Sequence, residues 1–478
     1  MSLKIFPTII LIICWLLLIT NVSYYSLLLT GVATLGFVFY NMKFYWKYFF
    51  FIVIFLFIVL IFLLVIKTVV FENNSSEQWI TVKVVQKYRN YYVVEYQKNY
   101  LMIKKYFFNI SLNIADQVKI KGIIFKHQAI NNFHQYNWGW DYYGKHIVGE
   151  IKLTNKQYFH YEAFTLRNYI WKWLQQYDYN NLLDFFLLQN YSDNHSELLA
   201  MWQKLNVSHL LVVSGFHINL QITLLRCVLC KLIKKSILRN SIIFAWLSFY
   251  VYLLNWQLSA LRALLYWTGS YINKIFKLNI SLLDLWAVVC CFFLIMNPLV
   301  LYQTNWQFSF LISLIIIYVN QICWNFNKIM KLLFTQLTIS IIILPITIYM
   351  QGHINLLFLV HQIIFSSLVQ IFYYFFLVII WIKPLLLFLH YLYQGILIFS
   401  YFLVSTTIFF HLTEMPMWFY FIYYVIVILL YYGWNNYVGK IMAFLGYVCV
   451  WGYWMLAPYL NSSLSVQMLN VGNALSIF

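Results

Sequence analysis

Charged side chains are scarce in this chain. Asp, Glu, Lys and Arg make up 9% of its 478 residues and hydrophobic residues 63%, and from residue 201 onward the only carboxylates are Asp284 and Glu414. Such a composition cannot cover a water-soluble fold, and the apolar runs are roughly 20 residues long, the length that spans a bilayer. The sequence therefore predicts a polytopic α-helical membrane protein in a lipid bilayer, not a membrane β-barrel.

Several signatures of catalysis are also absent. The chain contains no GxxxxGK[ST] loop, so it has no Walker-type site for driving transport with ATP. Its eleven histidines form neither HxH nor HExxH, the usual signatures of zinc hydrolases. Seven cysteines, with one CxxC pair at Cys227 and Cys230, are too few for a disulfide framework. We expect no enzymatic activity, no structural metal and no cofactor.

The net charge of +18 has two explanations. A basic protein suits nucleic acid or anionic lipid, but basic residues also collect in the cytoplasmic loops of membrane proteins. If the lysine- and arginine-rich loops from Arg226 onward are cytoplasmic, ten spans alternate consistently across the bilayer. These predicted spans are 207–226, 240–256, 258–273, 282–302, 304–322, 332–350, 354–381, 384–411, 416–432 and 438–457.

The N-terminal part, 1–71, holds three further apolar segments, at about 5–18, 24–40 and 48–66. We expect the first to be an uncleaved helix, because no small-residue cleavage site follows it. Lys43 and Lys47 place the end of the first helical hairpin inside, so the third helix exits outside. The insert that follows and the C-terminus are then both extracytoplasmic, in a multi-pass protein of the cell membrane.

Residues 72–162 have a different character, with 12 basic and 7 acidic residues in 91 positions. Apolar and polar residues alternate at 80–84, 91–96, 100–103, 118–125 and 147–153, which is the pattern of half-buried strands. Five strands in this length favour a small all-β barrel such as an OB-like fold, with a sandwich fragment as the alternative. Residues 163–200 form a connector. The mixed apolar and polar pattern of residues 166–188 predicts an interfacial amphipathic helix.

A group of polar residues lies at membrane depth at the start of the next domain, 201–457. Ser208, His209, Ser214 and His217 share one apolar run with Gly215, which could thin a helix and let backbone groups line a cavity. The alternative is a helix-packing face, where Ser and Gly permit close approach. We regard the two histidines as candidates for a polar pathway.

Four more polar residues lie near the start of later spans, on the same side of the membrane. Arg262 within a membrane costs roughly 2.5 to 3.5 kcal/mol on insertion scales, so it needs a partner or a wet cavity, unless it snorkels to the outer interface. Gln307 and Ser309 begin the span at 304–322, and His361 lies one to two turns into a later one. Their shared depth predicts a polar vestibule in the outer half of the bundle.

Four separated motifs, in order, resemble those of the ComEC-type competence proteins. Residues 209–217 (HLLVVSGFH) are similar to the family motif HLLAISGLH, and residues 258–263 (LSALRA) are similar to PSxxRA without its proline. Residues 297–298 (NP) and 305–310 (NWQFSF) are similar to the family's NP and GFQLSF pair. Residues 140–144 (WDYYG) are similar to the end of that family's OB-like insert. The resemblance extends over nearly the whole chain. It departs at the lost proline before Arg262, at Gln189-Asn190, and at His361, where the family often has Asn.

The resemblance implies a channel that admits one strand of DNA into the cytoplasm during competence. The implied partners are single-stranded DNA, a surface DNA receptor and a cytoplasmic motor protein; the sequence gives no oligomeric state. Residues 468–476 resemble the opening strand of a metallo-β-lactamase-like nuclease, with Asn470 and Leu475 in place of aspartates. We therefore interpret 458–478 as the extracytoplasmic start of a truncated domain, and expect no nuclease activity.

Two other functions stay open at this stage. A small-molecule or lipid transporter would also use a polar vestibule, and its pore would be too narrow for an extended strand or lined by carboxylates. A decayed, non-functional relative is the third interpretation, which the altered motifs and the truncation favour.

Overall fold

A computed structural model describes most of the chain between residues 74 and 411. The described ranges are 74–88, 90–97, 99–108, 111–126, 141–142, 144–176, 187–188, 196–210, 215–322, 327–351, 353–355, 357–379 and 388–411, with a few positions beyond them. The three predicted N-terminal spans, and the predicted spans 416–432 and 438–457, lie outside the described residues apart from three isolated positions.

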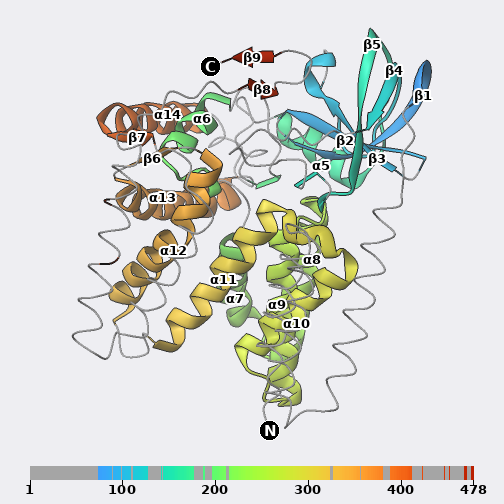
Figure 1. Ribbon diagram of the computed structural model, residues 1–478. Helices are drawn as coiled ribbons and strands as arrows, with labels where there is room; N and C mark the ends of the chain where they lie inside the picture. The colour runs from blue at the N-terminus through green and yellow to red at the C-terminus, as the bar shows by residue number, and fades with distance from the viewer. Residues whose placement is uncertain are drawn as a thin grey trace, which may run out of the picture.

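The predicted all-β insert is a closed five-stranded barrel (Figure 1). Its strands are β1 (Asn74–Lys87), β2 (Tyr91–Tyr96), β3 (Asn99–Lys104), β4 (Gln117–Lys126) and β5 (Ile147–Tyr161), with a short 3₁₀ turn, η2 (Lys105–Phe107), after β3. They are joined in the order β1-β2-β3-β5-β4, and β4 returns to pair with β1. Each predicted strand lies within an observed one, and β3 and β5 close the barrel as a parallel pair.

The alternation of side chains explains why these residues form a barrel. Successive residues of a strand point to opposite faces. On β1 the buried residues are Ile80, Val82 and Val84, and the exposed ones are Trp79, Thr81 and Lys83. The inward residues of β2, β3, β4 and β5 join them in one apolar core. Every second position can therefore carry charge or an aromatic ring into water without cost to that core.

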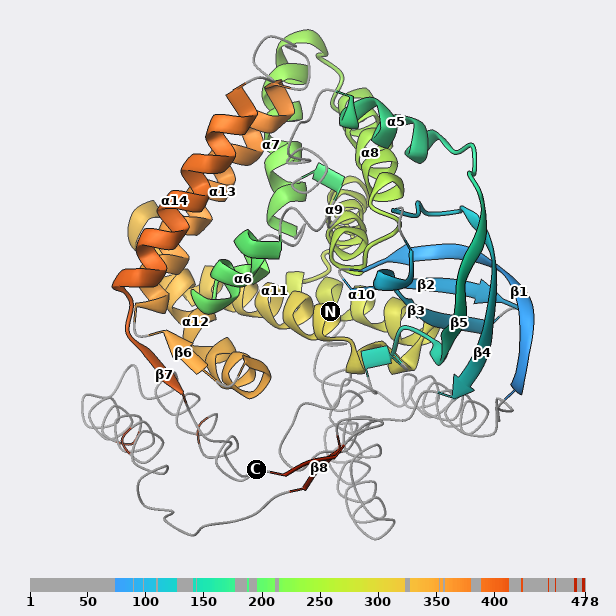
Figure 2. The ribbon, with the colours of Figure 1, turned by 90° about the horizontal axis from the view of Figure 1, so that it is seen from above.

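The described helices after the barrel form a bundle beside it. They are α5 (Leu166–Gln175), α6 (Ser196–Lys204), α7 (Gly215–Leu232), α8 (Ser236–Leu253), α9 (Leu258–Phe276), α10 (Leu282–Met296), α11 (Thr304–Ile322), α12 (Lys328–Gln351), α13 (Phe358–Ile379) and α14 (Phe388–Thr406). Short 3₁₀ helices, η5 (Ser208–Leu210) and η6 (Pro298–Tyr302), precede α7 and α11. The barrel lies on the side of α8 and α10, away from α13 and α14 (Figures 1 and 2).

Several predicted boundaries are wrong, and three of them matter most. The span expected at 207–226 begins only at Gly215, because Asn206 adopts a left-handed conformation (φ 60°) that ends α6 before the single turn of η5. The helix expected over 166–188 ends at Gln175. The single strand expected at 468–476 is a hairpin of β8 (Met468–Asn470) and β9 (Leu475–Ile477).

Two of the described helices have the length and composition of a membrane span. Within the described residues, Ser236–Leu253 and Phe358–Phe375 are long and apolar enough to cross a bilayer. Shorter apolar helices are Leu282–Met296, Thr304–Asn320, Ile329–Leu344 and Tyr391–Thr406. In the bundle β6 (His353–Asn355) and β7 (Phe409–His411) pair antiparallel and tie the start of α13 to the end of α14.

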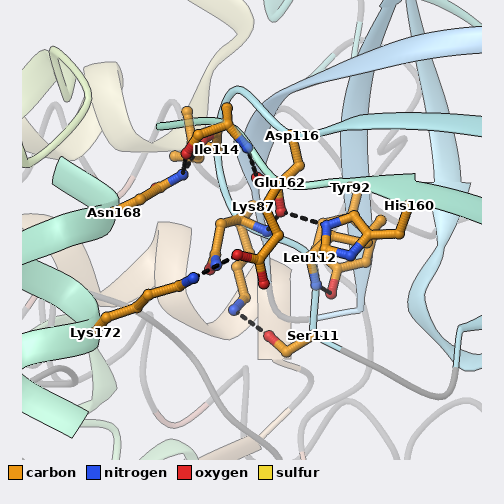
Figure 3. A network of polar contacts seen from close by, with 12 residues as sticks. Lys87, Tyr92, Ser111, Leu112, Ile114, Asp116, His160, Glu162, Asn168 and Lys172 are labelled. Atoms are coloured by element: carbon orange, nitrogen blue, oxygen red, sulfur yellow. Dashed lines mark hydrogen bonds and ion pairs between the residues drawn. The ribbon is translucent and has the colours of Figure 1, made fainter. Parts of the chain in front are cut away.

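A buried carboxylate holds the end of the barrel to α5 (Figure 3). Asp116, fully buried, accepts from His160 Nε2 at 2.8 Å and from the amide of Ala163 at 2.9 Å. Asn168 on α5 donates to the carbonyls of Ile114 (3.1 Å) and Ala163 (3.0 Å). The exit of β5 and the first turn of α5 are therefore fixed to the same loop.

A second joint, formed by Asp141 and Gly144, connects the barrel to α11. The Asp141 carboxylate accepts from the amide of Thr304, the first residue of α11, at 3.1 Å and so caps that helix from another domain. The Gly144 carbonyl accepts from the side-chain amide of Asn297 (Nδ2, 2.8 Å) and from the side-chain amide of Gln303 (Nε2). The segment before β5 is therefore hydrogen bonded to the residue that precedes η6 and to the residue that follows it.

Lys145 anchors this joint on the barrel side. Its ammonium pairs with Asp141, donates to the Tyr91 hydroxyl at 3.4 Å and lies 4.5 Å from the centre of the Tyr88 ring. Burial raises the pKa of both Tyr88 and Tyr91 well above the usual range of tyrosine, so both phenols are neutral. The cation therefore meets one carboxylate and neutral rings, and Asp141 is held where it caps α11.

Replacing Gly144 with Ala tests this joint. A Cβ there would lie 2.8 Å from the Leu299 carbonyl oxygen, so we expect a cost of about 1–3 kcal/mol and a loosened joint. Hydrogen–deuterium exchange should then be faster at the start of α11 and of β5. Gly395→Ala is the matched control, because nothing lies within 4 Å of its added Cβ. Equal exchange in wild type and Gly144→Ala would contradict the joint.

Candidate anion-binding site

Arg262 lies in the second turn of α9, with only 9% of its surface exposed. Its Nε donates to the hydroxyl of Ser309 on α11 at 2.7 Å. The guanidinium carbon lies 5.7 Å from the centre of the Phe310 ring. A serine and an aromatic face therefore support the cation, which suits the planar and weakly hydrated guanidinium.

Gly215 brings a third helix to the same guanidinium. A Cβ at Gly215 would lie 3.0 Å from Nη2 of Arg262 and 3.5 Å from the Cβ of Ala263, so a side chain at this position would press on the guanidinium. Gly215 is the first residue of α7, and Arg262 and Ser309 lie within the first two turns of α9 and α11. The buried cation thus lies beside the first residue of α7, whose N-terminus carries a partial positive charge, and near the second turns of α9 and α11.

No carboxylate neutralises Arg262 within the part of the chain that the structure describes. The five ion pairs described there all lie in the barrel or between β5 and α5. Asp284, on the neighbouring helix α10, is hydrogen bonded to the Ser281 hydroxyl that caps that helix. A buried cation with one hydrogen bond to the residues that the structure describes, beside the N-terminus of α7, is an arrangement that attracts an anion.

The other predicted site residues have different surroundings. Gln307 donates to the Leu301 carbonyl at 2.7 Å and so closes η6 onto α11. Ser208 is half-buried in η5, outside the helix that bears His217. Ser214 and the side chain of His209 lie outside the described residues. Of the eight predicted residues, the structure brings together Gly215, Arg262 and Ser309.

His217 belongs to a buried polar chain that the sequence analysis missed. Its ring meets that of Tyr373 edge to face at 4.7 Å. The Tyr373 hydroxyl accepts from Gln221 Nε2 at 2.6 Å and donates to the Tyr250 hydroxyl at 3.1 Å, and Trp246 Nε1 donates to Gln221 Oε1 at 2.9 Å. The one signal in the sequence was the spacing of His217 and Gln221, four residues apart on one helix face.

His361 has a structural partner. It is buried, and its Nδ1 lies 2.7 Å from Nδ2 of Asn355, a fully buried residue. The amide of Asn355 also donates to the Asn206 side chain at 3.0 Å. This contact fixes the chain just before η5 to the start of α13. It therefore also positions the segment that leads into α7.

Comparison with known proteins places these residues in a family. The sequence model of the competence protein family matches residues 188–437, just over half of the chain and including Gly215, Arg262 and Ser309. The chain is 28% identical over 195 residues to the uncharacterized protein MG316 of Mycoplasma genitalium, covering 41% of this chain and 50% of that protein. It is 27% identical over 218 residues to the MG316 homolog of Mycoplasma pneumoniae, covering 45% and 55%.

The chain thus spans about half the length of the curated relatives it matches. No solved structure matches it at a significant level. The family is membrane-associated, in agreement with the two apolar helices long enough to cross a bilayer. The match covers more than half of the sequence, and the chain therefore belongs to the competence protein family.

Proposed function

We propose that this chain is a channel component that passes single-stranded DNA through the membrane into the cytoplasm. The observation that carries the proposal is Arg262, a buried cation with no carboxylate partner among the described residues, within a family named for DNA uptake. DNA presents one phosphate per nucleotide, so a translocation path needs positive charge where the strand loses water. Arg262 supplies that charge at low local dielectric, where attraction is strongest.

The geometry around Arg262 suits a phosphate. Its Nε is held by Ser309, which fixes the plane of the guanidinium, and the two Nη groups would make the bidentate contact with a phosphate. Nη2 lies beside Gly215, where the first amides of α7 begin. Because Gly215 has no side chain, the guanidinium lies close to the N-terminus of α7, and both would attract the same anion.

The wider assignment follows from the same proposal. The protein would be multi-pass, with an OB-like barrel and the C-terminus outside the cell membrane. A surface receptor would deliver DNA, and a cytoplasmic motor would pull it. The proposed path runs along Ser208, His209, Ser214, Gly215, His217, Arg262, Gln307 and Ser309.

Substitution of Arg262 tests the path. Arg262→Leu should lower uptake of labelled DNA by roughly tenfold or more, because it removes a charge-assisted contact of about 1.5–3 kcal/mol. Arg262→Lys should restore part of the uptake, since it keeps the charge and loses the planar fork. The measurement is DNA uptake at matched protein levels in cells that depend on this chain.

Two serines give a matched control for the same assay. Ser309→Ala removes the partner of Arg262, whereas Ser270→Ala on α9 removes a hydroxyl that donates to the Tyr266 carbonyl of its own helix. We expect Ser309→Ala to lower uptake and Ser270→Ala to leave it unchanged. Equal uptake by wild type, Arg262→Lys and Arg262→Leu would remove Arg262 from the path. Uptake of small anions but not of DNA would favour a transporter instead.

Cysteine accessibility tests the orientation. In a background without the native cysteines, a cysteine at Tyr106, a barrel residue that is 70% exposed, should react with an impermeant reagent in intact cells. A cysteine at Lys234, in the exposed loop between α7 and α8, should react only after the membrane is opened. The opposite pattern would reverse the proposed topology.

A further inference from the structure

The outer face of β1, β4 and β5 carries aromatic rings and lysines in register. Successive rows across the strands are Lys83–Gln117–Tyr161, Thr81–Lys119–Phe159 and Trp79–Lys121. Each row holds one lysine and one ring, and two residues along a strand separate the rows by roughly 6.6 Å. These strands form the side of the barrel that is turned away from α13 and α14 (Figure 2).

The rings on this face are exposed, although large aromatic side chains usually contribute to a core. The exposed fractions are 45% for Trp79, 54% for Phe159 and 58% for Tyr161. Trp79 and Phe159 lie 5.8 Å apart between ring centres, and Nζ of Lys119 lies 5.7 Å from the centre of the Trp79 ring. The barrel core does not need these rings, because the inward residues of the same strands already fill it.

The lysines leave positive charge on the face. Lys121 pairs with the exposed carboxylate of Glu77 at 3.2 Å. Lys83 and Lys119 are exposed and form no ion pair within the described part of the chain. The face therefore offers an anionic polymer both charge and stacking surfaces, at intervals set by the strands.

We propose that this lysine–aromatic face, formed by Trp79, Lys83, Lys119, Lys121, Phe159 and Tyr161, binds single-stranded nucleic acid. Unpaired bases stack on exposed rings, and lysines track the phosphates, which is the combination that binds single strands without sequence preference. A row spacing of roughly 6.6 Å is about twice the 3.4 Å rise of stacked nucleotides, so the strand lies extended with its bases unstacked from one another. That this strand is DNA rests on the proposed function.

The composition of the face favours nucleic acid over a lipid surface. Lysines and aromatic rings also occur at membrane interfaces, where the apolar side of the protein enters the acyl region. The three rows contain no aliphatic residue; their remaining members are Thr81 and Gln117. The face thus has stacking rings and hydrogen-bonding groups and lacks the leucines and isoleucines that insert into lipid.

The test is binding of a fluorescent oligothymidylate to the full chain in nanodiscs of zwitterionic lipid, followed by fluorescence anisotropy. Trp79→Ala should weaken binding roughly fivefold to a hundredfold, since base stacking on one ring is of that size. Lys119→Gln should lower the slope of log affinity against log salt by about 0.7, the value for one phosphate contact on a single strand. Tyr106→Ala is the matched control, an exposed ring with Lys104 over it at 5.9 Å on a different part of the barrel.

Several outcomes would overturn the assignment. Unchanged affinity in Trp79→Ala, or an equal loss in Tyr106→Ala, would remove the face as the binding site. Loss of binding to anionic vesicles by Trp79→Ala, with oligothymidylate binding unchanged, would make it a membrane anchor. The result is independent of transport. Weakened oligonucleotide binding by Trp79→Ala supports the face as a binding site even if Arg262→Leu leaves DNA uptake unchanged. If Trp79→Ala leaves binding unchanged while Arg262→Leu lowers uptake, the face is not the binding site and the proposed channel function stands.

Discussion

The burial of one cation, Arg262, sets the arrangement of the bundle around it. A guanidinium out of water must be offset by contacts. Here the neighbouring groups come from two other helices: the Ser309 hydroxyl and the Phe310 ring on α11, and Gly215 on α7. A larger residue at 215 or the loss of Ser309 would leave the charge poorly supported. The meeting of α7, α9 and α11 within their first two turns therefore supports the buried charge.

The same helix α11 connects this site to the barrel. Asp141 caps α11 at Thr304, five residues before Ser309, and the Gly144 carbonyl is bonded on both sides of η6. A shift of the barrel that pulls Asp141 away would release the first turn of α11. Because Ser309 lies in the second turn, the orientation of Arg262 depends on a joint made largely by residues outside the bundle. The motif at 140–144 that suggested the family thus has a mechanical role here.

Local sequence predicted what depends on local patterns. The five strands were found from alternation, because one face of each fills a closed core. The start of α7 was misplaced, since 207–214 are mostly apolar and only the left-handed Asn206, bonded to Asn355 some 150 residues later, shows that the chain turns there. Partners such as Ser309 for Arg262, or Tyr373 for His217, lie on helices that are far apart in the sequence. No local sequence pattern therefore indicates these pairs.

The two proposed contacts with DNA differ in strength because their surroundings differ. Lys83 and Lys119 are exposed, so salt screens them and a strand on the lysine–aromatic face exchanges readily. Arg262 is 9% exposed, and its attraction for a phosphate is much less screened. The attraction for phosphate would therefore increase from the lysine–aromatic face to Arg262, and this difference would draw the strand inward. Transport also requires release. Arg262, the one buried arginine among the described residues, would bind one phosphate at a time and so hold the strand without stopping it.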